Sequence, residues 1–311
     1  TVTALEERVA GLAGKDAAVY VPSGTMGNQL ALRAHTEPGD QLVCHSDAHI
    51  LRYEGGGPAA LSGLQTTIIS TPDGSMPWAE VEAALHDPAD AHQARPRLVA
   101  FENTHNRCGG RVQDQVALDE CAAAARGRGL RTHLAGARLF NAAVKSGRPV
   151  GDLAAAVDSV SLCFSKGLGA PVGSVLAGSD DVIFRARRFR KQWGGGMRQA
   201  GILAAACLYA LDHNVDRLAV DHSHARALAR QIAHPEWQLR AEPDTNIELW
   251  DLDGDHDSAW FERELATVGV LVSSFGPRTV RMVTHLDVSS ADVDRAIEAV
   301  NEQGAAAKGA P

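Results

Sequence analysis

The sequence contains few cysteines, and their number and spacing do not suggest disulfide bonds. The five cysteines, at positions 44, 108, 121, 163 and 207, include no CxxC pair and are odd in number. A disulfide framework needs paired cysteines, and oxidising compartments favour such frameworks. We therefore expect reduced thiols and a cytoplasmic location.

Long apolar runs and net positive charge are also lacking. A membrane-spanning helix needs about 20 apolar residues. The longest candidate, 200–211, is shorter and rich in alanine, so it predicts a buried helix. The net charge of −8 at pH 7 disfavours nucleic acids and anionic membranes as partners. We expect a small-molecule substrate, no nucleic-acid partner and no membrane partner.

A metal-binding motif is missing despite thirteen histidines. Only His222 and His224 lie close together, and neither an HExxH motif nor a mixed Cys/His cluster accompanies them. Structural and catalytic zinc sites need three or four such ligands at defined spacings. The sequence therefore predicts no metal site.

What the sequence does contain is an alternation of strand and helix signals. Short apolar, β-branched runs are separated by longer helical segments such as 117–126. This alternation predicts an α/β fold with a mostly parallel sheet covered by helices on both faces. The expected strands are 17–22, 41–44, 66–69, 98–101, 132–134, 159–164 and 173–177.

The pattern changes near residue 215, which predicts two domains. We expect a large domain over 1–215 and a small α+β domain over 216–303. The small domain should have strands at 246–250, 268–272 and 279–284, and a last helix from Ser290 to about Glu302. Residues 304–311 are rich in Ala, Gly, Lys and Pro, which predicts a disordered tail.

One lysine occupies an unusual position. Ser165-Lys166-Gly167-Leu168 follows the apolar run 157–164, so Lys166 should stand where a buried strand gives way to a glycine-rich turn. Burial lowers a lysine pKa, and a neutral amine can form a Schiff base with an aldehyde. Most lysines at strand ends are simply solvated, so this feature is weak by itself.

A second motif has the pattern of a phosphate site. Ser23-Gly24-Thr25 connects an expected strand to an expected helix that begins near Met26. A helix N-terminus offers free N–H groups and a positive dipole end to an anion. An ordinary capped turn would look the same in isolation.

Several of these positions should meet at one sheet edge. Ligands bind at the carboxyl ends of parallel strands. The positions that fall at or just after the ends of expected strands are Ser23, Glu102, His105, Ala135 and Lys166.

In their order and spacing, four segments resemble the low-specificity L-threonine aldolases. The segments are 23–28 (SGTMGN), 102–106 (ENTHN), 131–142 (RTHLAGARLFNA) and 165–169 (SKGLG). The resemblance extends from Leu5 to the helix after Ser289. It implies a pyridoxal 5′-phosphate (PLP) enzyme of fold type I, the aspartate aminotransferase type. The implied reaction is retro-aldol cleavage of L-threonine, L-allo-threonine or related β-hydroxy-α-amino acids to glycine and an aldehyde.

The resemblance also implies roles for individual residues. Lys166 would bind the PLP aldehyde. His49 would stack on the PLP ring, and His105 would lie near the substrate side chain. The base would be His49, or a water held by both histidines. The PLP phosphate would be held by Ser23, Gly24, Thr25 and Ser165. The substrate carboxylate would be bound by Arg138, which would also lie beside the cofactor, and by Arg281. Arg198 would reach the phosphate or the carboxylate from across a subunit interface.

Two departures from the family pattern stand out. Family members carry an aspartate that pairs with the pyridine nitrogen where this sequence has Ala135. They also carry a further N-terminal arm, which supplies a serine to the substrate carboxylate and contacts a partner subunit, and which is absent from this sequence. Reduced aldolase activity is one expected consequence of Ala135.

Other functions stay open on these residues. The same fold could support a β-eliminating lyase or a racemase. A catalytically weakened PLP-binding protein with a regulatory or assembly role is a further alternative, although the presence of Lys166, both arginines and both histidines disfavours it. We expect a homodimer or homotetramer with shared active sites.

Overall fold

The computed structural model describes residues 1–308 and divides into two compact units. The first unit comprises residues 1–215 and the second begins at residue 216. No helix within 1–308 combines the length and apolar character that crossing a membrane requires. The five cysteines are free thiols.

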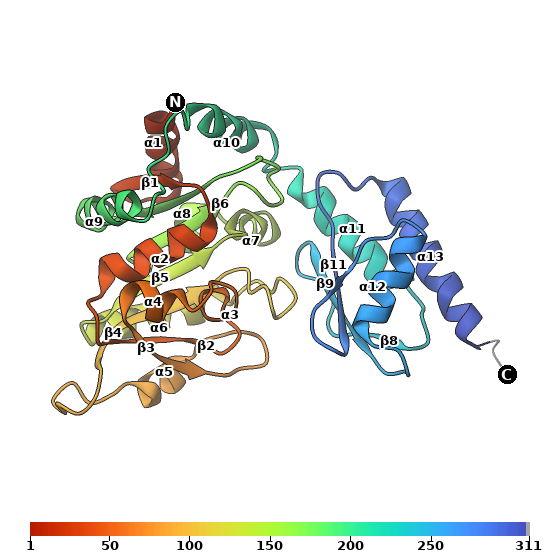
Figure 1. Ribbon diagram of the computed structural model, residues 1–311, viewed down its shortest axis with the longest axis horizontal. Coiled ribbons are helices and arrows are strands. Elements are labelled where there is room, and N and C mark those ends of the chain that lie inside the picture. The colour runs from red at the N-terminus through yellow and green to blue at the C-terminus, as the bar shows by residue number, and fades with distance from the viewer. Residues whose placement is uncertain (309–311) are drawn as a thin grey trace. The chain divides into compact units, whose positions relative to one another are not determined.

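The first unit is built on a seven-stranded sheet with the order β1-β7-β6-β5-β4-β2-β3 (Figure 1). Neighbours from β6 to β3 are parallel, whereas β7 is antiparallel to both β6 and β1. The sheet is therefore mostly parallel, and the predicted fold class is confirmed. The strands are β1 (Ala17–Val21), β2 (Asp40–His45), β3 (Gln65–Ile69), β4 (Arg95–Glu102), β5 (Arg131–Gly136), β6 (Ser159–Cys163) and β7 (Ser174–Gly178).

Helices cover both faces of this sheet. Adjacent residues of a strand point to opposite faces, and β6 shows this directly. A Cβ added to Gly27 of α2 would lie 3.5 Å from the Cβ of Ser161, so Ser161 faces α2. The adjacent Val160 points to the other face of the sheet, toward Leu139 at the start of α7. The helices of this unit are α1 (Val2–Ala13), α2 (Gly24–His35), α3 (His49–Arg52), α4 (Gly57–Ser62), α5 (Trp78–Ala84), α6 (Gln115–Gly127), α7 (Leu139–Ser146), α8 (Val150–Ala154), α9 (Asp180–Gln192) and α10 (Gly201–His213).

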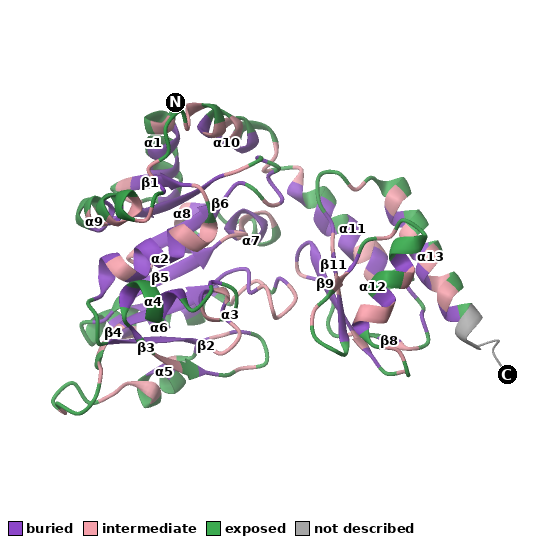
Figure 2. Cartoon of the chain, viewed as in Figure 1, coloured by how far each residue is buried: buried purple, intermediate pink, exposed green. Residues whose placement is uncertain are grey.

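Burial of apolar side chains fixes α2 against the sheet. Leu30 and Ala31 of α2 are fully buried against Val19, Val21 and Leu176 of the strands beneath. Each fully buried aliphatic side chain contributes about 1.5–3 kcal/mol relative to exposure. Figure 2 shows the central strands and the inner side of α2 as buried. This packing sets the position of the α2 N-terminus relative to the strand ends.

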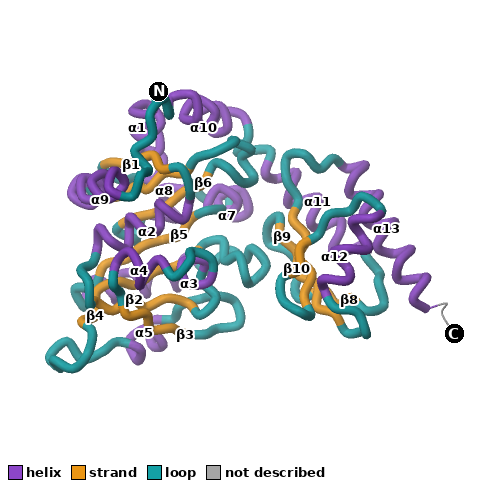
Figure 3. The backbone as a smooth tube through the Cα atoms, viewed as in Figure 1, coloured by secondary structure: helices purple, strands orange, loops and turns teal. Residues whose placement is uncertain are grey.

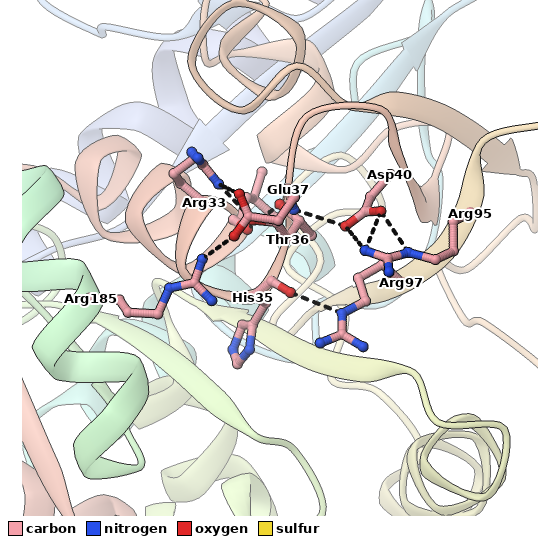
Figure 4. A network of polar contacts seen from close by, with 9 residues as sticks. Arg33, His35, Thr36, Glu37, Asp40, Arg95, Arg97 and Arg185 are labelled. Atoms are coloured by element: carbon pink, nitrogen blue, oxygen red, sulfur yellow. Dashed lines mark hydrogen bonds and ion pairs between the residues drawn. The ribbon is translucent and has the colours of Figure 1, made fainter.

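A polar network ties together the amino ends of β2 and β4 (Figure 4). Glu37 accepts hydrogen bonds from Arg33 at 3.0 Å and from Arg185 at 2.6 Å. Asp40, the first residue of β2, accepts from Arg95, the first residue of β4, at 3.0 Å and 3.2 Å. The network thus braces the sheet at the edge opposite the carboxyl ends of these parallel strands.

The second unit has a four-stranded antiparallel sheet of order β10-β11-β9-β8, seen as the second group of strands in Figure 3. Its core contains Trp237, Trp250 and Phe261 packed edge to face or tilted. Its elements are α11 (Leu218–Gln231), β8 (Trp237–Leu239), β9 (Ile247–Leu252), α12 (Ser258–Thr267), β10 (Ser273–Ser274), β11 (Thr279–Val283) and α13 (Ser290–Lys308).

One predicted strand of this unit is wrong. Residues 268–272 form the turn after α12, and only Ser273 and Ser274 pair as a strand. Gly269 has a φ of 82°, and the Val270 N–H donates to the Leu265 carbonyl, so the helix closes with a left-handed residue. Apolar residues occur at positions 270 and 272 because Val270 and Val272 pack on the core of this unit, and not because the segment is a strand.

The predicted disordered tail is wrong for residues 304–308, because α13 continues to Lys308. Gly304 is buried in this helix, and an added Cβ would come within 2.6 Å of Pro235 and 2.9 Å of His234. Close packing at Gly304, followed by three alanines with high helix propensity, extends the helix beyond Glu302. The remaining residues of the predicted tail, 309–311, lie outside the described residues.

Candidate active site

A cavity of about 240 Å³ opens at the carboxyl edge of the large sheet. The segments that line it follow β1, β2, β4, β5 and β6, as the topology of the sheet requires. Eight predicted site residues line it together: Ser23, Gly24, Thr25, His49, Ala135, Arg138, Ser165 and Lys166.

The N-terminus of α2 forms one wall of the cavity. Ser23 caps the helix, and its hydroxyl accepts from the Met26 N–H at 3.2 Å. A Cβ on Gly24 would lie 2.6 Å from the Cys163 sulfur, so the helix approaches β6 more closely than any larger residue permits. The free N–H groups of the first turn and the helix dipole make this wall suited to an anion.

Lys166 lies three residues beyond β6, in a tight turn. The Gly169 N–H donates to the Lys166 carbonyl at 2.9 Å, and Gly169 has a φ of 74°. Phe164, fully buried, anchors the start of the turn. The side chain of Lys166 is half-buried and faces the cavity, which positions its amine for reaction with a bound aldehyde.

His49 is oriented by a buried carboxylate. Its Nδ1 lies 2.8 Å from Oε1 of Glu54, whose side chain is fully buried. The carboxylate accepts, so Nδ1 carries a proton, and in the neutral ring the lone pair is on Nε2. The Glu54 carboxylate also accepts from Asn28 at 2.7 Å and from Gln29 at 2.6 Å. This arrangement leaves His49 with a fixed tautomer and a basic nitrogen.

Asn28 extends this network beneath the cavity. Its amide oxygen accepts from Ser161 at 2.5 Å and from Nε2 of His133 at 3.2 Å. Burial, and secondarily the nearby His35, lowers the pKa of His133 to about 3. His133 is therefore neutral at physiological pH, and the groups below Asn28 add no charge.

The floor of the cavity is a row of three residues on adjacent parallel strands. Ala135 on β5 pairs with Glu102 on β4 and with Ser161 on β6. The Glu102 carboxylate is held by two backbone donors, the His49 N–H at 2.6 Å and the Asn106 N–H at 2.8 Å. The position that Ala135 occupies thus presents a methyl group between a carboxylate and a hydroxyl.

Two of the other predicted residues, His105 and Arg198, do not line this cavity, and the third, Arg281, belongs to the second unit. His105 is fully buried, with its ring edge-on to the His45 ring at 4.7 Å between centroids, and it packs against Gly74. Arg198 is exposed just before α10 and does not line the cavity of its own chain. Arg281 belongs to the second unit, where its guanidinium lies 4.7 Å from the Phe275 ring. Roles for these three residues stay predictions.

Three residues that line the cavity or support it were not predicted from the sequence. Glu54 and Asn28 join the hydrogen-bond network, and Thr104 lines the cavity. Asn28 stands one turn into the helix after Ser-Gly-Thr, where an inward side chain could have been expected from the 3.6-residue period. Glu54 gave no such signal, because it lies in the connection between α3 and α4, whose bend brings its carboxylate to His49.

Comparison with known proteins identifies the family. The family model for β-eliminating lyases matches residues 1–255. A low-specificity L-threonine aldolase of Escherichia coli K12 is 42% identical over 290 residues, covering 93% of this chain and 85% of the relative. Low-specificity L-threonine aldolase 1 of Arabidopsis thaliana is 38% identical, covering 94% and 84%. The solved structure of a threonine aldolase from Leishmania major superposes with a TM-score of 0.79 at 22% identity, covering 92% and 84%.

These matches agree with the fold and with the convergence of a lysine, an anion-binding helix N-terminus and an oriented histidine on one cavity. The chain therefore belongs to the β-eliminating lyase family and, within it, to the low-specificity L-threonine aldolases, which are PLP-dependent enzymes.

Proposed function

We propose that this protein cleaves L-threonine, L-allo-threonine and related β-hydroxy-α-amino acids to glycine and an aldehyde. The observation that carries this proposal is the convergence of Lys166, the α2 N-terminus and the His49–Glu54 pair on one cavity. A lysine and a helix N-terminus suit PLP in general. The oriented imidazole adds a base for a substrate hydroxyl, which retro-aldol cleavage needs.

The cavity residues fit PLP at three points. The α2 N-terminus offers an anion cradle so close to β6 that a Cβ on Gly24 would overlap the Cys163 sulfur. Lys166 faces the same cavity, and His49 lines it with an imidazole that would stack on the ring. Ala135 is the exception, because a methyl group cannot pair with a protonated ring nitrogen.

Each residue then has a defined task. When bound, PLP supplies an aldehyde that condenses with amines and a conjugated ring that accepts the electron pair left when Cα–Cβ breaks. Lys166 would hold PLP until the substrate amine replaces the lysine, and Arg138 would bind the substrate carboxylate through its planar guanidinium.

His49 would remove the β-hydroxyl proton. Its Nε2 accepts the proton while Nδ1–H stays bonded to Glu54, whose negative charge stabilises the imidazolium that forms. Loss of that proton lets the hydroxyl oxygen become the aldehyde carbonyl as the Cα–Cβ bond breaks. His105 is walled off from the cavity, so the geometry favours His49 over a base shared between the two histidines.

The proposed function is tested by product analysis. The PLP-loaded protein, incubated with L-threonine, should release acetaldehyde and glycine in equal amounts. Ammonia with a keto acid would instead indicate a β-eliminating lyase, and D-amino acid without aldehyde a racemase. Either result, or PLP binding without any turnover, would overturn the proposal.

Arg281 would contribute a second contact to the substrate carboxylate. A charge-assisted hydrogen bond contributes about 1.5–3 kcal/mol, so Arg281→Ala should weaken glycine binding by roughly 10–100-fold. Arg138→Ala should have an effect of similar size. Spectral titration with glycine measures both. PLP content should stay near normal in Arg281→Ala.

Arg263→Ala is the matched control, because Arg263 is an exposed arginine of the same unit. Its glycine affinity should equal that of the unmodified protein. Unchanged glycine binding by Arg281→Ala would remove Arg281 from the site.

The protein would act as a homodimer or homotetramer with shared active sites. Helix α10 is apolar around its whole circumference, yet Ile202 and Tyr209 are 79% and 63% exposed on its outer side. Such helices are normally buried. Arg198, next to this helix, would then reach the cavity of a partner. Sedimentation should show at least a dimer, and a fully active monomer would contradict the proposal.

A further inference from the structure

Thr104 presents a buried hydroxyl to the cavity. It is 4% exposed and lines the cavity, and its Oγ1 has no hydrogen-bond partner among residues 1–308. Valine has the same shape as threonine and would fill the same space with a methyl group in place of the hydroxyl. Burial of an unpaired hydroxyl costs desolvation free energy that valine would avoid, so the hydroxyl is explained if a bound molecule satisfies it.

The neighbours of Thr104 do not share this arrangement. Asn103 and His105 are fully buried and do not line the cavity. Their side chains include unpaired atoms too, but these atoms are enclosed by protein: the His105 ring packs on Gly74 and His45. Within this segment, Thr104 alone combines burial, a missing partner and access to the cavity.

The residues two positions before and after Thr104 contact the two proposed ligands of the substrate. Glu102 Oε2 accepts from the N–H of His49, the proposed base. Asn106 Oδ1 accepts from Arg138, the proposed carboxylate ligand, in a long contact of 3.5 Å. Thr104 stands between Glu102 and Asn106 in the chain. A substrate with its carboxylate at Arg138 and its hydroxyl at His49 would therefore pass in front of Thr104.

We propose that the Thr104 hydroxyl donates a hydrogen bond to the β-oxygen of the substrate and so selects amino acids that carry one. This inference rests on the proposed function for the placement of the substrate. The hydroxyl would hold the β-oxygen while His49 takes the proton from it. Thr104 would then be the residue that distinguishes threonine from an amino acid of similar size without a β-oxygen.

The test compares two variants and two ligands that are not cleaved. Thr104→Val keeps the shape and removes the hydroxyl, whereas Thr104→Ser keeps the hydroxyl. O-methyl-L-threonine retains a β-oxygen but has no hydroxyl proton to lose, and L-2-aminobutyrate lacks the β-oxygen. Dissociation constants are measured by spectral titration of the PLP-loaded proteins, and PLP affinity is measured on the apoproteins.

Thr104→Val should weaken O-methyl-L-threonine binding by roughly 2- to 10-fold, the range expected for one neutral hydrogen bond. Binding of L-2-aminobutyrate, glycine and PLP should change less than 2-fold, which is our estimate for the loss of a group that these ligands do not contact. Thr104→Ser should bind every ligand as the unmodified protein does. The kcat/KM for L-threonine should fall with the O-methyl-L-threonine affinity.

Equal losses for both amino acids, or a loss of PLP affinity, would show that the hydroxyl serves the cofactor or the carboxylate and would overturn the proposal. Unchanged binding of O-methyl-L-threonine by Thr104→Val would overturn it as well. Because these ligands are not cleaved, the comparison remains valid even if the protein does not cleave threonine, so failure of the inference and failure of the proposed function are distinguishable.

Discussion

Replacing Lys166 with alanine should abolish the borohydride-trappable adduct between the protein and PLP, and with it threonine cleavage. Among the described residues that line the cavity, Lys166 is the only lysine. The turn closed by Gly169 fixes the backbone that carries this amine. Mass spectrometry after borohydride reduction measures the adduct.

Lys145→Ala provides the matched control for this experiment. Lys145 is exposed on α7, the helix that begins directly after Arg138, and it lies outside the cavity. The control should keep both the adduct and the activity. An adduct that persists in Lys166→Ala would show that another amine binds PLP, and the assignment of Lys166 would have to be abandoned.

The strands that position the site could be predicted from the sequence because their signals are local. The apolar run that ends at Cys163 and the Ser-Gly-Thr turn after Val21 have one plausible conformation each, strand and strand–turn–helix. Parallel connectivity then brings Ser23 and Lys166 to the same edge. The meeting of these two residues therefore followed from backbone patterns, whereas His49 and Arg138 were expected only from the family resemblance.

Side-chain direction within irregular segments could not be predicted in this way. The segment 102–106 has no periodicity, so nothing in it indicated that Thr104 faces the cavity while His105 packs behind it on Gly74. Glu54 is comparable, because its contact with His49 depends on the bend between two short helices. The strand predicted at 268–272 was wrong because a turn that packs on the core has the same run of apolar residues as a strand.

The contacts of Ala135 show why its replacement should have the second large effect. The residue pairs with Glu102 and Ser161, and the Asn28 amide and the neutral His133 below Ser161 carry no charge. The carboxylate that Asn28 contacts, Glu54, is bound to His49. The carboxylate nearest in the row, Glu102, is already bound by two backbone N–H groups. No residue on this floor is arranged to take over the ion pair that an aspartate would make.

Ala135→Asp should therefore raise threonine cleavage by roughly 10–100-fold, because a charge-assisted hydrogen bond contributes about 1.5–3 kcal/mol and each 1.36 kcal/mol of barrier is tenfold in rate. A carboxylate at position 135 would raise the pKa of the ring nitrogen and keep it protonated, so the ring would accept the electron pair of the broken bond more readily. The Michaelis constant for threonine should change little, and PLP should be retained better through dialysis.

Ala135→Asn separates charge from shape, since asparagine fills the same space without a negative charge. It should retain PLP no better than the unmodified protein and should not share the rate increase. If Ala135→Asp is no faster than Ala135→Asn, the ring nitrogen does not limit the reaction. The uncharged Ala135 and Ser161 of the floor would then suit a reaction that places less negative charge on the ring, and threonine cleavage would not be the chemistry for which this cavity is built.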